Sequence, residues 1–161
     1  DLGATPLDQL VCGASGGGLI AGINLSMAAR APDVPVIGVE PAGYDDTRLS
    51  LAAGRPVAYP PPAHVTICDA LMTQQPGDLT FPINRRLDRV VDVTDAEVAA
   101  AVAYAFKVLK LVVEPGGAVS LAALLAGKVE AKDRVTALVL SGGNIDPALF
   151  AAIIEDRFAG G

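Results

Sequence analysis

The chain has 161 residues and a formal net charge of −6, from 12 Lys and Arg against 18 Asp and Glu. This acidic balance argues against nucleic acid and anionic membranes as partners, and the 4% of aromatic residues offers no surface for base stacking. No run of about 18 apolar residues occurs, so the 52% of hydrophobic residues indicates strands covered on both faces rather than a membrane-spanning helix. Two cysteines are too few for a disulfide framework and favour a reduced, cytoplasmic location.

The first third of the chain alternates short apolar runs with helical patterns. A buried strand is predicted at residues 10–12, and a helix is predicted at residues 18–30 that must end before Pro32, because proline cannot continue a helix. A second strand is predicted at residues 34–39, and residues 47–53 predict a short helix that ends at a glycine.

The middle of the chain is rich in proline. Residues 55–66 contain four prolines, so we expect them to be extended or irregular. Residues 67–74 predict a short helix that ends at Pro76. Because the proline-rich stretch is too short to separate two domains, residues 1–161 are expected to form a single α/β domain.

The clearest helix signal comes in the second half of the chain. After a strand predicted at residues 89–93, Thr94 and Glu97 form a capping-box pattern, in which each side chain bonds the other residue's N–H group. The helix that starts there must stop before Pro115, because the residue before a proline disfavours the helical conformation.

The last third of the chain completes the alternation. Small residues predict a closely packed helix at 117–126, and a nearly continuous apolar run predicts a buried strand at 135–140. Asp146 as N-cap and Pro147 at the first helical position then open a last helix. Since strands alternate with helices throughout, we expect an α/β protein, a three-layer sandwich with a mainly parallel sheet.

Two glycine-rich turns, each led by a serine, directly follow predicted strands. The first glycine turn, residues 15–18, precedes a helix, and the second glycine turn, residues 141–144, follows the strand at 135–140. Glycines let backbone N–H groups approach an anion, and a helix start adds a positive dipole end, so the first turn predicts a phosphate site. A tight turn without any ligand is an equally good interpretation of this motif alone.

The first glycine turn also matches a nucleophile elbow. Residues 13–17 read G-x-S-x-G between a strand and a helix, which would make Ser15 the nucleophile of a serine hydrolase. Its base would be His64, the one histidine of the chain, or an aspartate in a serine–aspartate dyad. The second glycine turn favours the cofactor interpretation, because the hydroxyl of Ser141 can bond a heteroaromatic nitrogen without requiring that nitrogen to be protonated.

Six segments, collinear along the chain, resemble the C-terminal half of the pyridoxal-phosphate-dependent serine/threonine dehydratases, the group that includes serine racemase and threonine ammonia-lyase. They cover nearly the whole chain, and this agreement is far more specific than either glycine turn alone. The resemblance implies an incomplete large domain of the tryptophan synthase β-like fold. The segments are residues 11–22, 36–46, 67–77, 91–98, 109–121 and 138–146 (VCGASGGGLIAG, VIGVEPAGYDD, ICDALMTQQPG, VDVTDAEV, LKLVVEPGGAVSL and LVLSGGNID).

The resemblance implies a binding site for pyridoxal 5′-phosphate. Ser141 would face the pyridine nitrogen, and Glu114 belongs to a glutamate–proline segment that lies near the cofactor ring in the family. This chain departs from the family pattern in two places: serine takes the first position of the phosphate cup, where glycine is frequent, and Asp69-Ala70 replaces the usual Asp-Gly pair. The residues of the implied phosphate cup are Ser15, Gly16, Gly17, Gly18 and Leu19.

The resemblance further implies a divalent-cation site. Glu40 and Asp46 match the carboxylates that ligate Mg²⁺ or Ca²⁺ in some of these dehydratases, and Tyr44 would contribute its main-chain carbonyl. Hard cations prefer such oxygen ligands. The alternative is that Asp45 or Asp46 merely caps the helix that follows.

An essential part of the implied enzyme lies outside this chain. In the family, the lysine that carries the cofactor as a Schiff base, the loop for the substrate carboxylate and a small domain all belong to the N-terminal half. The lysines of this chain stand in helix or loop contexts unlike the family's lysine motif, so we expect no catalytic residue within the chain. These lysines are Lys107, Lys110, Lys128 and Lys132.

The implied activity of the complete enzyme is β-elimination, which converts a hydroxy amino acid such as threonine or serine into a 2-oxo acid and ammonia. The family also contains racemases, and the residues of this chain do not separate the two reactions. We expect the chain alone to be inactive, its partner to be the missing N-terminal half or a complementary chain, and the full enzyme to be a homo-oligomer. A serine hydrolase and a non-catalytic α/β module that pairs with another chain stay open as alternatives.

Overall fold

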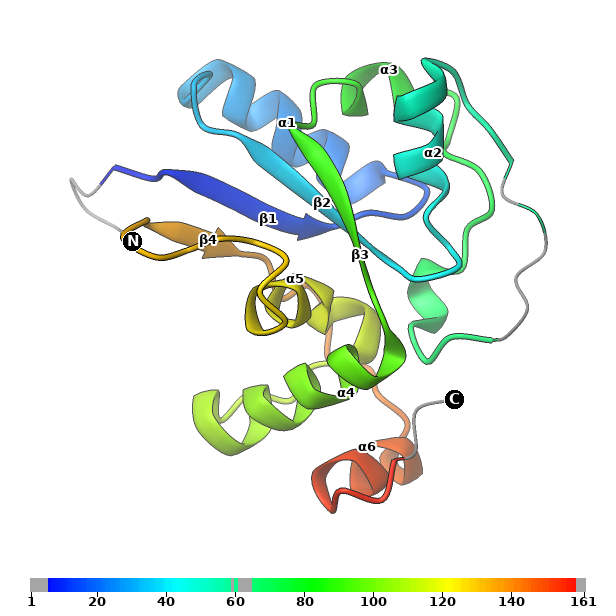
Figure 1. The fold of residues 1–161 in the computed structure, drawn as a ribbon, viewed down its shortest axis with the longest axis vertical. Coiled ribbons are helices and arrows are strands. Elements are labelled where there is room, and N and C mark those ends of the chain that lie inside the picture. The colour runs from blue at the N-terminus through cyan, green and yellow to red at the C-terminus, as the bar shows by residue number, and fades with distance from the viewer. Residues whose placement is uncertain (1–5, 59, 61–64, 159–161) are drawn as a thin grey trace.

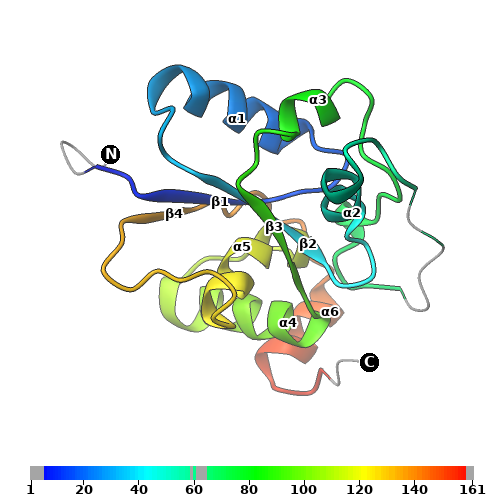
Figure 2. The same cartoon turned by 45° about the horizontal axis from the view of Figure 1, so that its top comes forward.

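The computed structural model describes residues 6–58, 60 and 65–158 (Figure 1). Its strands are β1 (Gln9–Gly13), β2 (Val36–Pro41), β3 (Arg89–Val93) and β4 (Thr136–Leu138). They form one parallel sheet in the order β3-β2-β1-β4. Helices cover both faces of the sheet, as Figures 1 and 2 show. The expected three-layer α/β sandwich with a parallel sheet is thereby confirmed.

The helices divide between the two faces. They are α1 (Gly18–Arg30), α2 (Asp46–Ala53), α3 (Phe81–Asn84), α4 (Asp95–Tyr104), α5 (Pro115–Leu125) and α6 (Pro147–Ile154), with a 3₁₀ turn η1 (Asp69–Leu71) and a π-helical turn η2 (Ala105–Leu109). On one face α1 packs against β2 and α3, and α2 packs against β3. On the other face α5 contacts β1, β2 and β3, α4 packs against α5, and α6 packs against α4 (Figures 1 and 2).

Each face of the sheet has its own apolar core. Successive side chains of a strand point to opposite faces, so Val11 joins the core under α4 and α5 while Cys12 joins the core under α1. The small residues at the start of α5 let it lie directly on the sheet, and residues 115–123 are all buried. A Cβ on Gly13 would lie only 3.0 Å from Val119 Cγ2, so this approach depends on glycine in β1.

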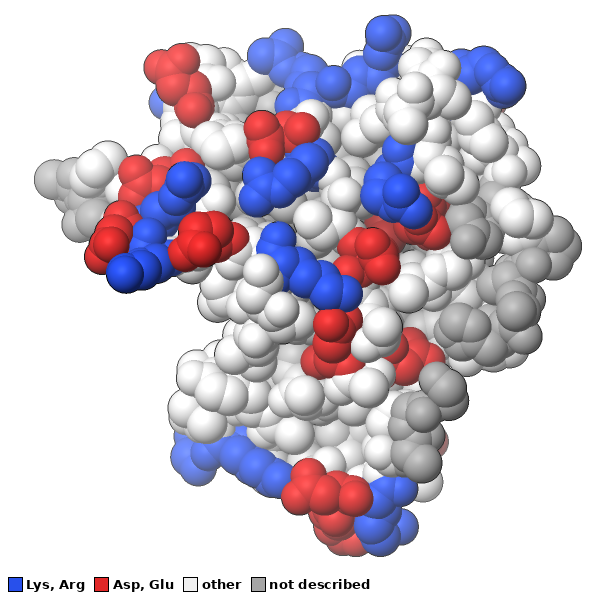
Figure 3. Space-filling model, viewed as in Figure 1, with Lys and Arg blue, Asp and Glu red and all other residues white. Residues whose placement is uncertain are grey.

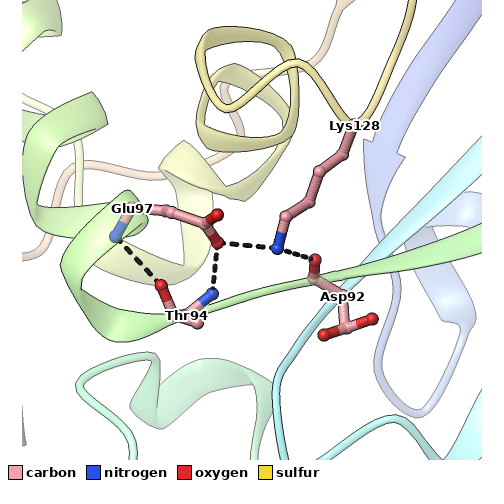
Figure 4. Close-up of polar contacts among 4 residues, drawn as sticks. All are labelled: Asp92, Thr94, Glu97 and Lys128. Atoms are coloured by element: carbon pink, nitrogen blue, oxygen red, sulfur yellow. Dashed lines mark hydrogen bonds and ion pairs between the residues drawn. The ribbon is translucent and has the colours of Figure 1, made fainter.

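The predicted capping box at the start of α4 is present and extended by a lysine (Figure 4). Thr94 N–H donates to Glu97 Oε2 at 2.7 Å, and Glu97 N–H donates to Thr94 Oγ1 at 3.3 Å. Lys128 Nζ donates to the same Glu97 oxygen and to the main-chain oxygen of Asp92, both at 2.8 Å. Burial opposes ionisation of Glu97, but the hydrogen bonds from Lys128 and Thr94 outweigh it and hold the pKa of Glu97 below its usual range.

Some predicted elements differ from the structure. The helix predicted at residues 117–126 already begins at Pro115, because a proline is accepted in the first helical turn. The strand predicted at 135–140 is only three residues long as β4, which pairs with β1 alone among the described strands. Residues 67–74 form only the turn η1, and the one-turn helix α3, with Pro82 in it, is not predicted at all. The helix at 18–30 and the strand at 89–93 are confirmed.

Charges of both signs are interspersed on the face that Figure 3 shows, without a continuous basic field. This agrees with the acidic balance of the sequence. Of the helices in the described part of the chain, none has both the length and the apolar character needed to span a bilayer.

Candidate cofactor-binding site

The two glycine turns meet at one edge of the sheet. They follow β1 and β4, which are neighbouring parallel strands, so the carboxyl ends of both strands lie side by side. Strand order reverses at β1, since β2 lies on one side of it and β4 on the other, and open α/β sheets bind ligands at such switch points. A cavity of about 380 Å³ lies between the turns. Its lining residues are Gly13, Ser15, Gly16, Gly17, Gly18, Leu19, Ile20, Ala70, Leu71, Gly116 and Ser141.

Six of the seven residues predicted to bind the cofactor line this cavity: residues 15–19 and Ser141. The seventh, Glu114, is not among the lining residues. Its N–H group donates to Gly142 O at 2.9 Å, and its Oε2 accepts the N–H group of Asn144 at 3.1 Å. Glu114 therefore bonds the backbone of the second glycine turn without lining the cavity. Its predicted place near a cofactor ring stays a prediction.

The first glycine turn presents backbone donors to the cavity. Gly17 has a φ of 87°, a left-handed conformation that favours glycine, and a Cβ there would lie 2.4 Å from Asn84 Nδ2. Gly18 begins α1 and faces open space, with no heavy atom within 4 Å of the position of a Cβ. The first N–H groups of a helix have no partner within it and carry the positive end of its dipole, so this arrangement suits a phosphate dianion.

Two side chains that the sequence analysis missed hold the carbonyls of this turn. Thr80 Oγ1 donates to Gly16 O at 2.6 Å, and Asn84 Nδ2 donates to Gly17 O at 3.2 Å. Both come from the segment around α3, far along the chain from the turn. The spacing of Thr80 and Asn84, four residues apart on one helical turn, was the one available signal, and such a pair occurs too often to be informative.

Ser15 has no base beside it in the described part of the chain. Its Oγ lies 2.9 Å from Thr73 Oγ1, and Thr73 in turn donates to Asp46 Oδ1 at 3.5 Å. The hydroxyl therefore reaches a carboxylate only through Thr73, whereas a nucleophilic serine needs a base within direct hydrogen-bond reach. His64, the other candidate base, lies outside the described residues. These contacts give the serine hydrolase hypothesis no support.

Glu40 of β2 and Asp46, the first residue of α2, form a buried acidic pair. Glu40 Oε1 accepts the N–H group of Thr47 at 3.0 Å, and Glu40 Oε2 accepts that of Arg48 at 3.1 Å. Glu40 thus satisfies the first N–H groups of α2 from the neighbouring strand. Asp45 occupies the N-cap position of this helix, as the alternative expects, but its side chain makes no capping hydrogen bond.

The acidic pair is costly to ionise. Burial, together with the charge of Asp46, raises the pKa of Glu40 to about 8, and burial raises the pKa of Asp46 to about 7. Asp46 Oδ2 has no hydrogen-bond partner among the described residues. The predicted cation site of Glu40, Asp46 and the Tyr44 carbonyl stays a prediction. No group of three or more His, Cys, Asp or Glu side chains in the described ranges is arranged to hold a metal.

No lysine lines the cavity in the part of the chain that the structure describes. Lys107 Nζ lies 3.6 Å from Asp156 Oδ1, and Lys110 Nζ donates to the main-chain oxygen of Lys107 at 2.8 Å. Lys128 is bound to the capping box of α4. That the lysines of this chain do not serve the cofactor stays a prediction.

Comparison with known proteins identifies the family. Residues 1–142 match the family described as "Pyridoxal-phosphate dependent enzyme". The L-threonine ammonia-lyase of Geobacter sulfurreducens is 43% identical over 141 residues, which are 87% of this chain and 35% of that protein. The L-threo-3-hydroxyaspartate ammonia-lyase of Pseudomonas sp is 36% identical over 151 residues, which are 93% of this chain and 47% of that protein.

The fold agrees with this family. The structure of maize serine racemase superposes with a TM-score of 0.80 at 34% identity, covering 94% of this chain and 47% of that one. The chain spans less than half the length of each of these three relatives. The resemblance to the serine/threonine dehydratases and to their tryptophan synthase β-like fold is confirmed. The chain belongs to the pyridoxal-phosphate dependent enzyme family.

Proposed function

We propose that this chain is part of a pyridoxal-phosphate-dependent ammonia-lyase that eliminates water from a hydroxy amino acid such as threonine or serine, giving a 2-oxo acid and ammonia. The observation that carries the proposal is the single cavity between the two glycine turns, lined by residues 15–19 on one side and Ser141 on the other. The identity to threonine and hydroxyaspartate ammonia-lyases, at 43% and 36%, supports this reaction.

The role of the chain would be to bind and orient the cofactor. N–H groups of the first glycine turn and of the start of α1 would hold the phosphate, and the Ser15 hydroxyl would add a further polar contact. The Ser141 hydroxyl would bond the pyridine nitrogen and, being neutral, would not require that nitrogen to carry a proton. When bound, the cofactor supplies the electron sink that makes the α-proton of the amino acid removable.

Other parts of the chemistry belong to residues outside this chain. A lysine that carries the cofactor and the contacts to the substrate carboxylate would come from the remaining part of the enzyme, because no lysine of the described residues lines the cavity. Those outside residues would also decide between elimination and racemisation, since they contact the amino acid. We infer that the chain functions in association with that remaining part and that the complete enzyme is a homo-oligomer.

A cation is the second part of the proposal. Glu40 and Asp46, with the Tyr44 carbonyl, would bind Mg²⁺ or Ca²⁺. The unpartnered Asp46 Oδ2 and the raised pKa values of the acidic pair support this, because a cation would compensate two buried carboxylates. Adding Mg²⁺ or Ca²⁺ at pH 8 should then raise the melting temperature of the wild-type chain and leave that of Asp46→Asn unchanged. Equal shifts in both proteins, or none, would argue against the cation site.

The cofactor role is tested by binding and by trapping. The 161-residue chain should bind pyridoxal 5′-phosphate without developing the absorbance band of a protonated Schiff base. Borohydride reduction followed by mass spectrometry should label no single lysine stoichiometrically. Ammonia release from threonine or serine by this chain with added cofactor would contradict the assignment of the lysine to the remaining part of the enzyme.

A further inference from the structure

The first glycine turn is fixed from the side that faces away from the cavity. Gly16 O accepts a hydrogen bond from Thr80 Oγ1 at 2.6 Å. Gly17 O accepts one from Asn84 Nδ2 at 3.2 Å, in addition to the N–H group of Ala21 at 2.9 Å, which is the first hydrogen bond of α1. Gly16 and Gly17 line the cavity, whereas Thr80 and Asn84 do not. The two carbonyl oxygens are therefore turned out of the cavity, toward the segment around α3.

The direction of each carbonyl sets the direction of the next N–H group. In a trans peptide the C=O of one residue and the N–H of the following residue point in opposite directions, and the described chain contains no cis peptide bond. Holding the carbonyl of Gly16 outward thus directs the N–H group of Gly17 inward. Asn84 and the first hydrogen bond of α1 together hold the carbonyl of Gly17, which directs the N–H group of Gly18 inward. These are the donors that a phosphate would meet.

Both supporting side chains are themselves held in place. Asn84 is 1% exposed and Asn24 is 4% exposed, and Asn24 Nδ2 donates to Asn84 Oδ1 at 3.2 Å. This bond fixes which end of the Asn84 amide faces Gly17. Thr80 is fixed through its backbone, because its N–H group donates to Gly77 O at 3.1 Å. Hydrogen bonds among buried and half-buried polar groups of this kind favour a single geometry.

We propose that Thr80 and Asn84 are positioning residues for the cofactor phosphate: they orient the peptides of the first glycine turn so that the N–H groups of Gly17 and Gly18 face the phosphate. The inference rests on the proposed function of the cavity. It adds two residues that neither contact the cofactor nor belong to the glycine motif, and that act through the backbone they hold.

Thr80→Val tests this with little change in shape. The substitution removes the hydroxyl donor, while Gly16 O keeps the N–H group of Gly77 at 3.3 Å as a second partner. Thr80→Ser keeps the hydroxyl and serves as the rescue variant. Thr136→Val is the matched control, because it also removes one hydroxyl, bonded to Gln9 Nε2 at 2.8 Å, at the other end of β4 from the cavity.

The ligands are pyridoxine 5′-phosphate and pyridoxine, which have no aldehyde and so cannot react with surface lysines. Thr80→Val should weaken binding of the phosphorylated ligand about three- to tenfold, the loss expected for misaligned hydrogen bonds, and leave binding of pyridoxine unchanged. Thr80→Ser and Thr136→Val should bind both ligands like the wild type. In ¹⁵N-resolved spectra, the phosphorylated ligand should shift the amide signals of Gly17 and Gly18 in the wild type and less in Thr80→Val.

The outcomes separate the two levels of the proposal. A wild-type chain that prefers the phosphorylated ligand, with Thr80→Val keeping that preference in full, would overturn the positioning role alone. A wild-type chain without any preference for the phosphorylated ligand would overturn the phosphate cup and the positioning role with it. Equal losses in Thr80→Val and Thr136→Val would also overturn the positioning role, because they would reflect general destabilisation.

Discussion

The two glycine turns have similar sequences but different surroundings. The first follows β1, an inner strand with neighbours on both sides, and its serine is half-buried and bonded to Thr73. The second follows β4, an edge strand of the described sheet, and Ser141 is exposed. The side chains of Thr80 and Asn84 bond the first turn, whereas among the side chains of the described residues only the Glu114 carboxylate bonds the backbone of the second turn, which also accepts the N–H group of Glu114.

This difference indicates how the site is divided. The half proposed to bind the phosphate is completed within this chain and is held by buried polar contacts. The half proposed to face the cofactor ring follows the edge strand β4 of the described sheet, and fewer side-chain hydrogen bonds hold it. Substitutions should therefore be tolerated less well in the first glycine turn than in the second.

The largest expected effect is at Gly17. Gly17→Ala places a Cβ 2.4 Å from Asn84 Nδ2 and forces a non-glycine residue to a φ of 87°. We expect a loss of about 3 kcal/mol in the free energy of unfolding, measured by urea denaturation. Gly18→Ala is the control, since its Cβ meets no heavy atom within 4 Å, and should change stability by less than about 0.5 kcal/mol. Similar losses of unfolding free energy in Gly17→Ala and Gly18→Ala would contradict the view that the conformation and packing of Gly17 constrain the first turn.

The acidic pair, linked to the first turn through Thr73, should make stability depend on pH. With folded pKa values of about 8 for Glu40 and about 7 for Asp46, the folded chain keeps protons that the unfolded chain releases above about pH 4. The free energy of unfolding should therefore fall as pH rises toward 8, by at most about 1.4 kcal/mol per pH unit for each group. Urea midpoints measured between pH 5 and 8 give this slope, and Asp46→Asn should reduce it. A urea midpoint that rises with pH would disprove the predicted pH dependence.

The second glycine turn should tolerate a comparable substitution better. Gly142→Ala places a Cβ 2.4 Å from Glu114 Oε1, at the end of a flexible side chain that can move if it gives up its hydrogen bond to Asn144. The expected loss is about 1 kcal/mol, the cost of giving up the hydrogen bond from Asn144 to Glu114. Denaturation of Gly142→Ala beside Gly17→Ala checks the ranking, and a larger loss at Gly142 would reverse the interpretation of the two turns.

The smallest expected difference separates the two serines. Ser15→Ala removes the hydrogen bond to Thr73 and should cost about 1 kcal/mol in the free energy of unfolding. Ser141→Ala removes an exposed hydroxyl and should stay within about 0.5 kcal/mol of the wild type. Thermal and urea unfolding of both variants provide the measurement. If Ser141→Ala proved the more destabilising, the second turn would be more constrained than its exposure indicates.

Much of the fold follows from local signals in the sequence. The capping box at Thr94 and the proline after residues 18–30 mark helix ends through contacts made within a few residues, so both are predictable. The meeting of the two glycine turns is predictable too, because carboxyl ends of parallel strands share one edge. β4 is shorter than its apolar run indicates, because an edge strand is paired on one side only.

The supports of the site are not predictable from the sequence. Thr80 and Asn84 act on Gly16 and Gly17, which lie more than sixty positions away in the chain. Threonine and asparagine are common polar residues, and only the path of the chain through α3 brings them under the turn. The capping of α2 by Glu40 is equally hidden, because the acceptor comes from a strand rather than from the residues that precede the helix.

The pairing of β1 with β4 also has a kinetic consequence. Gln9 lies opposite Thr136, so the sheet joins residues 127 positions apart. Closing so large a loop is slow relative to forming local turns, and β1 pairs with β4 only after the intervening segments are available. During synthesis, the first glycine turn would exist long before the second, and the cavity would form only after residue 141 had left the ribosome. The cofactor would therefore meet both glycine turns together only after β4 had paired with β1.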